Sequence, residues 1–521
     1  MYQQCVWTVC VLALVWALTA SAGVAEGRGT VEIGQQKQLF VDDYIIDEMQ
    51  NVSQVLNPVT KYPGNPVLRP DRAWEGLQVY MYGSVIYDDD EDLFKMWYIG
   101  WAPSSINCCY ATSEDGINWQ KPELGIVDFQ GSKRNNCINW VGMGMIYSPN
   151  DPDPGKRYKS IIGRRGGFSA DGLTWHVPPE SQDIPGDIVS DNVIPFCYDE
   201  QSRRYVAFPK VNRESGGHLR RSVSVSFSDD FLTWTPVQTI LVPDERDDEL
   251  ADQRVAALRE PHFDDGPEWH LAQFYGHCGF PYEGMYLGLL WVFDISGWCP
   301  EMAEVQGRRA GVGGEDGPVQ VELTSSRDLV HWQRVGERQP LIPLGEAGSY
   351  DSGQIYTTNR PLIVGDEIWI YYGGIRNTHG HPLYWREETD RFPRILEAIE
   401  RASPRTGGTI NLAKLRLDGW VSVDAGDEPG TLTTKPLKFA GDKLVINAEA
   451  QDGWIGVEIL GRSGQRPVPG FSLADCERFS GDSVRHTVKW RGNSDLSRLQ
   501  GRPVRLRFHL QNAKLYSFVF R

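Results

Sequence analysis

The stretch Ser113-Glu-Asp-Gly-Ile-Asn-Trp119 decides the fold, because its pattern returns three more times along the chain. Each copy has a Ser, an Asp two residues later and a Trp four residues after the Asp; the others are Ser169–Trp175, Ser228–Trp234 and Ser326–Trp332. The Asp can accept hydrogen bonds from turn amides, and the Trp can bury its ring where the next strand begins. The pattern predicts a structural β-hairpin turn that recurs about every 55 to 100 residues, as in the blades of a β-propeller.

Pairs of apolar or aromatic runs fill the chain between these turns. An acidic or Gly/Pro-containing turn separates the members of each pair, as expected of neighbouring antiparallel strands. The pairs are residues 81–88 with 93–100, 137–148 with 157–163, 193–199 with 204–210, 261–263 with 270–275, and 353–358 with 367–373. The sequence therefore predicts an all-β fold in which residues 76–430 form a five-bladed β-propeller.

The rest of the chain is expected to flank this propeller. Residues 431–521 contain short strand-like runs and Gly-rich turns, which predict a C-terminal β-sandwich. Residues 23–75 are expected to be an N-terminal segment that leads into the propeller. The acidic runs 88–92 and 247–249 are predicted to be solvated turns, with a calcium site there unsupported.

The net charge and the N-terminal residues indicate which partners are disfavoured and where in the cell the protein is expected. The 521-residue chain has a formal net charge of −17, which disfavours binding to nucleic acids and anionic membranes. An apolar run from Val6 to Ala20 is followed by Ser21-Ala22, which fits a signal peptide over residues 1–22. We expect a secreted or periplasmic protein that begins near Gly23. A membrane anchor is the alternative, but the run is short for a membrane span.

The cysteines give no metal motif. Two of the 9 cysteines, Cys5 and Cys10, lie in the expected signal peptide, and the odd number that remains leaves at least one thiol unpaired. No Cys-x-x-Cys pair occurs, so the sequence predicts neither a metal site nor a cofactor. The adjacent Cys108 and Cys109 should alternate across a strand and are predicted to be packing residues.

Several motifs resemble those of known families. Ser326–Trp332 and Asn65-Pro-Val-Leu68 ahead of Trp74-Glu75 resemble the five-bladed glycoside hydrolases of the invertase, levanase and arabinanase group, families 32 and 43. Leu39-Phe-Val-Asp-Asp-Tyr-Ile-Ile-Asp47 and Leu415-Arg-Leu-Asp-Gly-Trp420 resemble secreted, planctomycete-type propeller proteins of unknown substrate more closely. The second resemblance spans nearly the whole mature chain and implies the fold more firmly than the activity.

The resemblance implies roles for three carboxylates that precede inner blade strands. Asp191 corresponds to the transition-state stabiliser, Glu260 to the general acid, and Asp351 to a carboxylate that lines the pocket. The first blade departs from the families, because residues 79–85 contain no Asp. We name Asp43 as the missing ionised partner, with Asp42, Glu75 and Asp351 as alternatives; a structural role closing the propeller is an equally good interpretation of Asp43.

Sugar recognition requires flat aromatic faces and polar groups that form two hydrogen bonds at once with the sugar. Candidates flank the predicted acid or follow predicted strands: Arg259, His262, Tyr350, Arg376, His379, His381 and Trp101, with Trp298 and His277 as further possibilities. His379 and His381 form a His-x-His pair that could bind metal, but no third ligand is in sequence reach, so no metal is predicted.

Two function classes follow from these features. The first is a secreted glycoside hydrolase that cleaves an oligo- or polysaccharide with a carboxylate pair at the mouth of the propeller channel. The alternative is a non-catalytic propeller that binds glycan or protein at a cell surface, which the missing first-blade carboxylate favours. A sialidase is a weaker interpretation, because those enzymes have six blades, an Arg triad and a Tyr nucleophile. The sugar, the linkage and the stereochemical outcome remain open.

Overall fold

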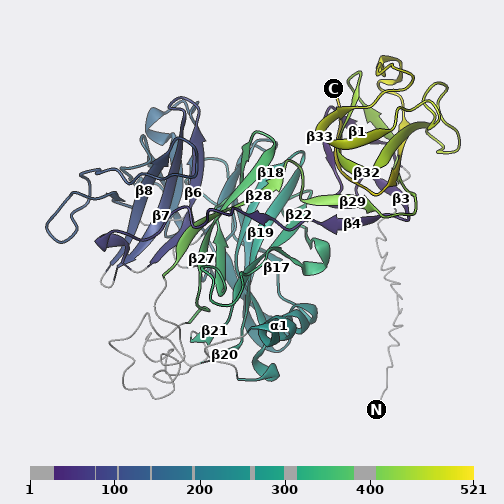
Figure 1. Ribbon diagram of the computed structural model, residues 1–521. Helices are drawn as coiled ribbons and strands as arrows, with labels where there is room; N and C mark the ends of the chain where they lie inside the picture. The colour runs from purple at the N-terminus through teal and green to yellow at the C-terminus, as the bar shows by residue number, and fades with distance from the viewer. Residues whose placement is uncertain are drawn as a thin grey trace, which may run out of the picture.

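The computed structural model describes residues 29–76, 78–102, 105–140, 144–190, 194–258, 265–298, 314–380 and 407–521 (Figure 1). Strands are the main secondary structure of these residues, with short 3-10 turns and a single α-helix among them, α1 (Glu245–Ala257). The predicted all-β class is confirmed.

The first three groups of strands are small antiparallel sheets, each built from consecutive stretches of chain. The first contains β6 (Gln78–Asp88), β7 (Leu93–Ala102), β8 (Ser105–Ser113) and β9 (Cys137–Ile138). The second contains β10 (Ile146–Tyr147), β11 (Tyr158–Ile162) and β12 (Arg165–Ser169). The third contains β13 (Phe196–Asp199), β14 (Arg204–Ala207), β15 (Lys210–Ser215), β16 (His218–Ser228) and β17 (Gln238–Leu241).

The fourth and fifth groups share one ten-stranded sheet, joined where Val319 pairs in parallel with Gln354. The fourth group contains β18 (Ala272–Tyr282), β19 (Met285–Asp294), β22 (Val319–Ser326), β23 (Trp332–Arg334) and β24 (Pro340–Ile342). The fifth contains β25 (Gln354–Thr357), β26 (Leu362–Val364), β27 (Glu367–Ile375), β28 (Thr409–Arg416) and the N-terminal strand β5 (Thr60–Lys61). Separately, β20 (Gly297–Trp298) pairs with β21 (Glu315–Asp316).

The C-terminal strands form an eleven-stranded sheet that includes the N-terminal strands. Its members are β1 (Val31–Gly34), β2 (Gln38–Leu39), β3 (Ile46–Gln50), β4 (Ser53–Leu56), β29 (Val421–Ala425), β30 (Gly430–Thr434), β31 (Leu437–Phe439), β32 (Leu444–Gly461), β33 (Phe479–Thr487), β34 (Val504–Gln511) and β35 (Ala513–Phe520). Figure 1 shows the purple N-terminal strands among the yellow C-terminal ones. The structure therefore differs from the predicted division at residues 75 and 430, because β1 to β4 find their partners in the C-terminal unit.

A buried carboxylate joins the two parts of the molecule. Asp418 accepts hydrogen bonds from Tyr282 at 2.8 Å and Ser517 at 2.8 Å, and it pairs with Lys37 at 3.0 Å. Tyr282 ends β18, Ser517 lies in β35, and Lys37 precedes β2. A buried charge is tolerated only when it is well partnered, so this arrangement fixes the C-terminal sheet against the fourth strand group.

All four Ser-x-Asp turns have the same hydrogen bonds. Each Asp accepts from the backbone amides two and three residues later at 2.7–2.9 Å, and each Ser hydroxyl accepts from the amide three residues later at 2.9 Å. The fourth residue of every turn has positive φ: 71° at Gly116, 73° at Gly172, 64° at Phe231 and 68° at Leu329. The predicted structural turn is confirmed in every copy.

The turn tips also bind the neighbouring strand group. The carbonyl of Gly116 accepts a hydrogen bond from Tyr371 of β27 at 2.7 Å. The carbonyl of Gly172 accepts one from Trp97 of β7 at 2.8 Å. A Cβ on Gly172 would lie 2.8 Å from the Trp97 ring, so glycine permits this close approach. These two turns therefore fasten the first group to the fifth and the second group to the first.

The acidic run at residues 247–249 lies in α1, so the prediction of a solvated turn there is wrong. Asp244 caps the helix by accepting from the amide of Asp247, whose side chain accepts in return from the amide of Asp244. Asp247 is buried and pairs with Arg334 at 2.8 Å. The capping box and these ion pairs stabilise the helix. Its hydrophobic pattern alone does not predict a helix here.

Candidate functional site

Aromatic side chains from three strand groups meet at one place, which we call the aromatic cluster. Its members are Tyr80 and Tyr82 of β6, Trp101 of β7, Tyr275 of β18, Trp291 of β19 and Tyr356 of β25. The Tyr82 ring centroid lies 4.9 Å from that of Tyr356 and 5.7 Å from that of Trp291. Tyr82 and Trp101 are only partly buried, so the cluster presents aromatic surface.

Local sequence explains why β6 presents two tyrosines together. Val79 and Met81 pack into the core of the first group, and alternation turns Tyr80 and Tyr82 to the other face. The register then shifts between Tyr80 and Ser84. Gly83 lies at this irregularity, where a Cβ would come within 1.8 Å of the Trp97 carbonyl oxygen. Glycine allows the close approach that accompanies the irregular register.

A polar edge adjoins the cluster through Tyr275. The Tyr275 hydroxyl lies 3.2 Å from Nε2 of His379, and the other ring nitrogen lies 3.4 Å from the carbonyl oxygen of Glu315. Burial and the nearby Arg221 lower the pKa of His379 to about 4. His379 is therefore neutral near pH 7, with Nδ1 donating to the carbonyl and Nε2 accepting from Tyr275.

Two cations lie against the same tyrosine. The ammonium of Lys210, on β15, is 4.3 Å from the Tyr275 ring centroid, and the guanidinium of Arg221 is 5.9 Å from it. Arg221 also pairs with the Glu315 carboxylate at 3.4 Å. Burial raises the pKa of Tyr82, and the neighbouring Tyr275 and Tyr356 add to the rise. The Tyr82 hydroxyl is therefore protonated at neutral pH and serves as a donor or acceptor rather than as an anion.

Asp351 is buried and fully occupied by partners. Its carboxylate pairs with Lys61 at 2.6 Å and accepts hydrogen bonds from Tyr372 at 2.9 Å and Ser349 at 3.1 Å. Lys61 belongs to β5, so this carboxylate ties the N-terminal strand to the fifth group. Such an arrangement holds the carboxylate in one fixed position.

Asp43 lies elsewhere in the molecule. It is exposed on the bend between β2 and β3, and its neighbour Asp42 binds Arg327 at 2.8 Å. Arg327 follows the end of β22, whereas Asp351 precedes the strand that pairs with the start of β22. The length of β22 separates the two ends by roughly 23 Å. Asp43 therefore lies apart from Asp351, because the N-terminal segment pairs with the C-terminal sheet. Its predicted role as the partner of Glu260 stays a prediction.

Glu75 has a structural role. It is completely buried and pairs with Lys121 at 2.7 Å. The Tyr98 hydroxyl donates to it at 2.5 Å, and the backbone amides of Asp71 and Arg72 donate at 2.9 and 3.1 Å. A carboxylate with this many partners anchors the segment that enters β6.

The other predicted residues fall into three classes. Trp101 and His379 belong to the cluster and its polar edge, while Tyr350 packs against the hydrophobic core that the fourth and fifth groups share and Arg376 follows β27. His277 is fully buried against the rings of Phe208 and Trp332, so it packs between the third and fourth groups. Asp191, Arg259, Glu260, His262 and His381 lie outside the described residues, and their roles remain predictions.

Sequence reasoning missed Tyr82, Tyr275, Tyr356 and Lys210. Each lies inside or at the end of a predicted strand, where an aromatic residue is usually a core residue. The one available signal was the Tyr-x-Tyr spacing at Tyr80 and Tyr82, which places both rings on one strand face.

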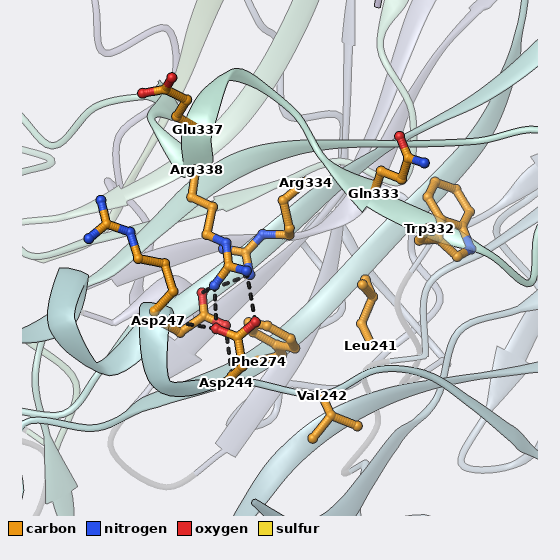
Figure 2. Close-up of a pocket in the computed structure, with 11 residues that line it drawn as sticks. Leu241, Val242, Asp244, Asp247, Phe274, Trp332, Gln333, Arg334, Glu337 and Arg338 are labelled. Atoms are coloured by element: carbon orange, nitrogen blue, oxygen red, sulfur yellow. Dashed lines mark hydrogen bonds and ion pairs between the residues drawn. The ribbon is translucent and has the colours of Figure 1, made fainter. Parts of the chain in front are cut away.

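A separate hollow of about 540 Å³ lies beside α1 (Figure 2). Figure 2 shows Arg334 and Arg338 pointing toward Asp244 and Asp247. Arg338 binds Asp244 at 2.8 Å and Asp247 at 3.1 Å. These pairs hold the start of α1 against β23 and the following 3-10 turn, Gly336–Arg338. We interpret the hollow as scaffold, because its central charges satisfy one another.

A buried ionic network continues beneath this hollow. Arg254 of α1 pairs with Glu322 at 2.8 Å and with Asp294 at 3.4 Å, and both carboxylates are completely buried. Burial raises the pKa of Asp294 to about 6, against the opposing attraction of Arg254. Gln320 donates to the same carboxylate at 2.7 Å. The network fixes α1 and offers no access for a substrate. Within the described ranges, no group of three or more His, Cys, Asp and Glu side chains is placed to hold a metal ion.

Comparisons with known proteins give coarse structural likeness only. No family model and no curated protein matches the chain. Among solved structures it is similar to a protein described as a glycoside hydrolase, with TM-score 0.38, 11% identity, and coverage of 71% of this chain and 92% of the other. It is also similar to a glycosyl hydrolase from Bacteroides ovatus, with TM-score 0.37, 12% identity, and coverage of 70% and 94%. The Bombyx mori GH32 β-fructofuranosidase gives TM-score 0.37, 12% identity, and coverage of 89% and 95%. Likeness at this level does not place the chain in a family.

Proposed function

We propose that this protein is a secreted, glycoside hydrolase-like enzyme that acts on an oligo- or polysaccharide at the aromatic cluster. The observation that carries the proposal is the convergence of Tyr82, Tyr275 and Tyr356 with the partly exposed Trp101. Flat aromatic faces stack on the apolar faces of sugar rings, and phenol and imidazole groups can bond sugar hydroxyls. Neutral His379, held in one tautomer, supplies such a polar group beside them.

We propose further that the five strand groups are the blades of one propeller and that the eleven-stranded sheet is a β-sandwich. The groups follow one another along the chain, and each has an antiparallel arrangement. Strand β5 adds to β28 at the outer side of the fifth group, which would close the ring with N-terminal residues. The first strands of the first, fourth and fifth groups each contribute a ring to the aromatic cluster, as expected at a central channel.

For the chemistry, Glu260 remains the proposed general acid and Asp191 the proposed transition-state stabiliser. Asp351 would hold the site together through Lys61 and Tyr372. Tyr82 occupies the first group, where the resembling families have a carboxylate. Because its hydroxyl stays protonated, Tyr82 would bind the substrate or the transition state by hydrogen bonding, and the ionised group would come from another blade.

The test begins with a screen of the purified full-length protein against plant and algal oligosaccharides. Activity is measured as the release of reducing ends. Glu260→Gln should lower turnover by about a hundred to ten thousandfold while ligand binding persists, because the amide keeps the shape but cannot give a proton. Glu337→Gln is the matched control, since Glu337 is exposed at the hollow beside α1. Unchanged turnover in Glu260→Gln would show that Glu260 is not the general acid.

The alternative is a non-catalytic glycan-binding protein, and one observation favours it: the first group offers Tyr82 instead of a carboxylate. In that case the same oligosaccharides would bind without turnover. Tyr82→Ala would then weaken binding, whereas Glu260→Gln would change affinity only modestly.

Export is part of the proposal and rests on the N-terminal sequence, because residues 1–28 lie outside the described residues. No helix in the described part of the chain has the length and apolar character needed to cross a bilayer. Intact-mass measurement of protein from the culture medium or periplasm should give a start near Gly23. A soluble cytoplasmic product that retains Met1 would contradict export.

A further inference from the structure

Two cysteines of the first strand group face each other across neighbouring strands. Cys109 of β8 pairs with Cys137 of β9, while Cys108 pairs with Ile138. Alternation places Cys109 and Cys137 on one face, in the core of the first group, and Cys108 on the opposite face in a different core cluster. The two facing thiols are free in the structure and are completely or almost completely buried.

The hydrogen-bond pattern fixes the kind of pair they form. The amide of Tyr110 donates to the carbonyl of Asn136 at 2.9 Å, so Tyr110 and Asn136 form the hydrogen-bonded pair. The adjacent Cys109 and Cys137 therefore form a non-hydrogen-bonded pair, in which Cα atoms are about 4.5 Å apart and side chains are closest. That separation lies within the roughly 4.4–6.8 Å range of disulfides.

We propose that Cys109 and Cys137 are joined by a disulfide when the chain folds in an oxidising environment. The Sγ–Sγ bond forms with loss of two electrons and two protons from the thiols. The oxidant is another disulfide, of glutathione or of a thiol oxidoreductase, whose S–S bond breaks to give two thiols. This inference is independent of glycosidase activity.

The position explains what the bond would stabilise. Strand β9 contains two residues and lies at the edge of its sheet, so few ladder hydrogen bonds hold it. The chain between the two cysteines includes the first Ser-x-Asp turn and a long irregular stretch. A cross-link would close this loop, restrict the unfolded chain and fasten the edge strand. Because both thiols are buried in the folded protein, the bond forms before the sheet closes around them.

The test is cell-free synthesis of the full-length chain in a buffer of oxidised and reduced glutathione, and in parallel with dithiothreitol. Free thiols are blocked with N-ethylmaleimide in denaturant before peptide mapping. We expect a peptide linking Cys109 to Cys137 in the glutathione sample alone, and a melting temperature several degrees higher for that sample.

Matched variants separate this pair from its neighbour. Cys108→Ala should keep the linked peptide, whereas Cys109→Ala and Cys137→Ala should each abolish it and remove the difference in melting temperature between the two buffers. Alkylation of both Cys109 and Cys137 in the glutathione sample would overturn the proposal, as would a linkage of either to another cysteine.

Discussion

The outer hairpin turns are alike in every copy, whereas the aromatic cluster is built from different residues in each strand group that contributes to it. Every Ser-x-Asp turn repeats the same hydrogen bonds and the same positive φ in its fourth residue. At the aromatic cluster the contributing strand groups differ: the first gives two tyrosines and a tryptophan, the fourth a tyrosine and a tryptophan, and the fifth a tyrosine, while a lysine of the third lies against one of the rings. Repetition thus marks what each sheet needs for its own stability, and departure from repetition marks where a single ligand would be recognised.

The largest expected effect is on stability, at an outer turn. Trp332 is buried, its ring packs on His277 and Phe208, and its Nε1 donates to the carbonyl of Leu329. Trp332→Ala should lower the free energy of unfolding by roughly 3–5 kcal/mol, measured by denaturant titration. Activity or glycan affinity per folded molecule should stay unchanged. The control is Gln333→Ala, at the exposed neighbouring position; equal losses in both variants would contradict the distinction between turn and surface.

At the aromatic cluster the expected effect is functional. Tyr82→Phe removes one hydroxyl and leaves the ring in place. Turnover or glycan affinity should fall about ten to a hundredfold with little change in melting temperature, because a hydrogen bond to the ligand is lost. Tyr87→Phe is the matched control on the same strand, since Tyr87 is exposed. If Tyr82→Phe has the same turnover and glycan affinity as the unchanged protein, the Tyr82 hydroxyl does not bind the glycan.

A smaller effect is expected from the glycine of the second turn. Gly172 has φ of 73°, and a Cβ there would lie 2.8 Å from Trp97. Gly172→Ala should therefore cost about 1–2 kcal/mol of stability, from backbone strain and crowding together. Gly163→Ala separates the two causes, because Gly163 has φ of 62° but open space around a Cβ. If both variants lose the same stability, crowding against Trp97 contributes nothing.

The smallest effect depends on pH. Although burial opposes it, hydrogen bonds from His331 and backbone amides lower the pKa of Asp328 to about 2, from the ordinary value of 3.8. A carboxylate with a lowered pKa stabilises the fold above its ordinary pKa and loses that contribution as the pH falls toward 2. Asp328→Asn should therefore be less stable than the unchanged protein near pH 6, by about 1 kcal/mol, and the gap should shrink near pH 2.5. A gap that does not vary with pH would show that the charge of Asp328 is unimportant.

How far the sequence predicts this molecule depends on the range of the interactions. The Ser-x-Asp turns were predictable because the Ser, the Asp and the amides they bind lie within five residues of each other. The surroundings of Asp43 were not predictable, because they are set by pairing with strands almost four hundred residues away, which local pattern does not reveal. Tyr82, Tyr275 and Tyr356 were missed because a tyrosine that faces a ligand and one that faces the core occupy strands in the same way. The acidic run of α1 was taken for a turn although Asp244 and Asp247 have the spacing of a capping box.

The pairing of β2 with β35 delays the folding of the N-terminal strands during synthesis. Gln38 lies opposite Phe518, so β2 meets its partner strand only after the long stretch of chain between them has been synthesised. At ribosomal rates the wait is on the order of half a minute to a minute and a half. During that time β1 and β2 have unpaired backbone edges, which are sites for wrong association with other chains. Factors that hold nascent chains unfolded should therefore affect the yield of this protein more than that of a protein whose first and last strands belong to different sheets.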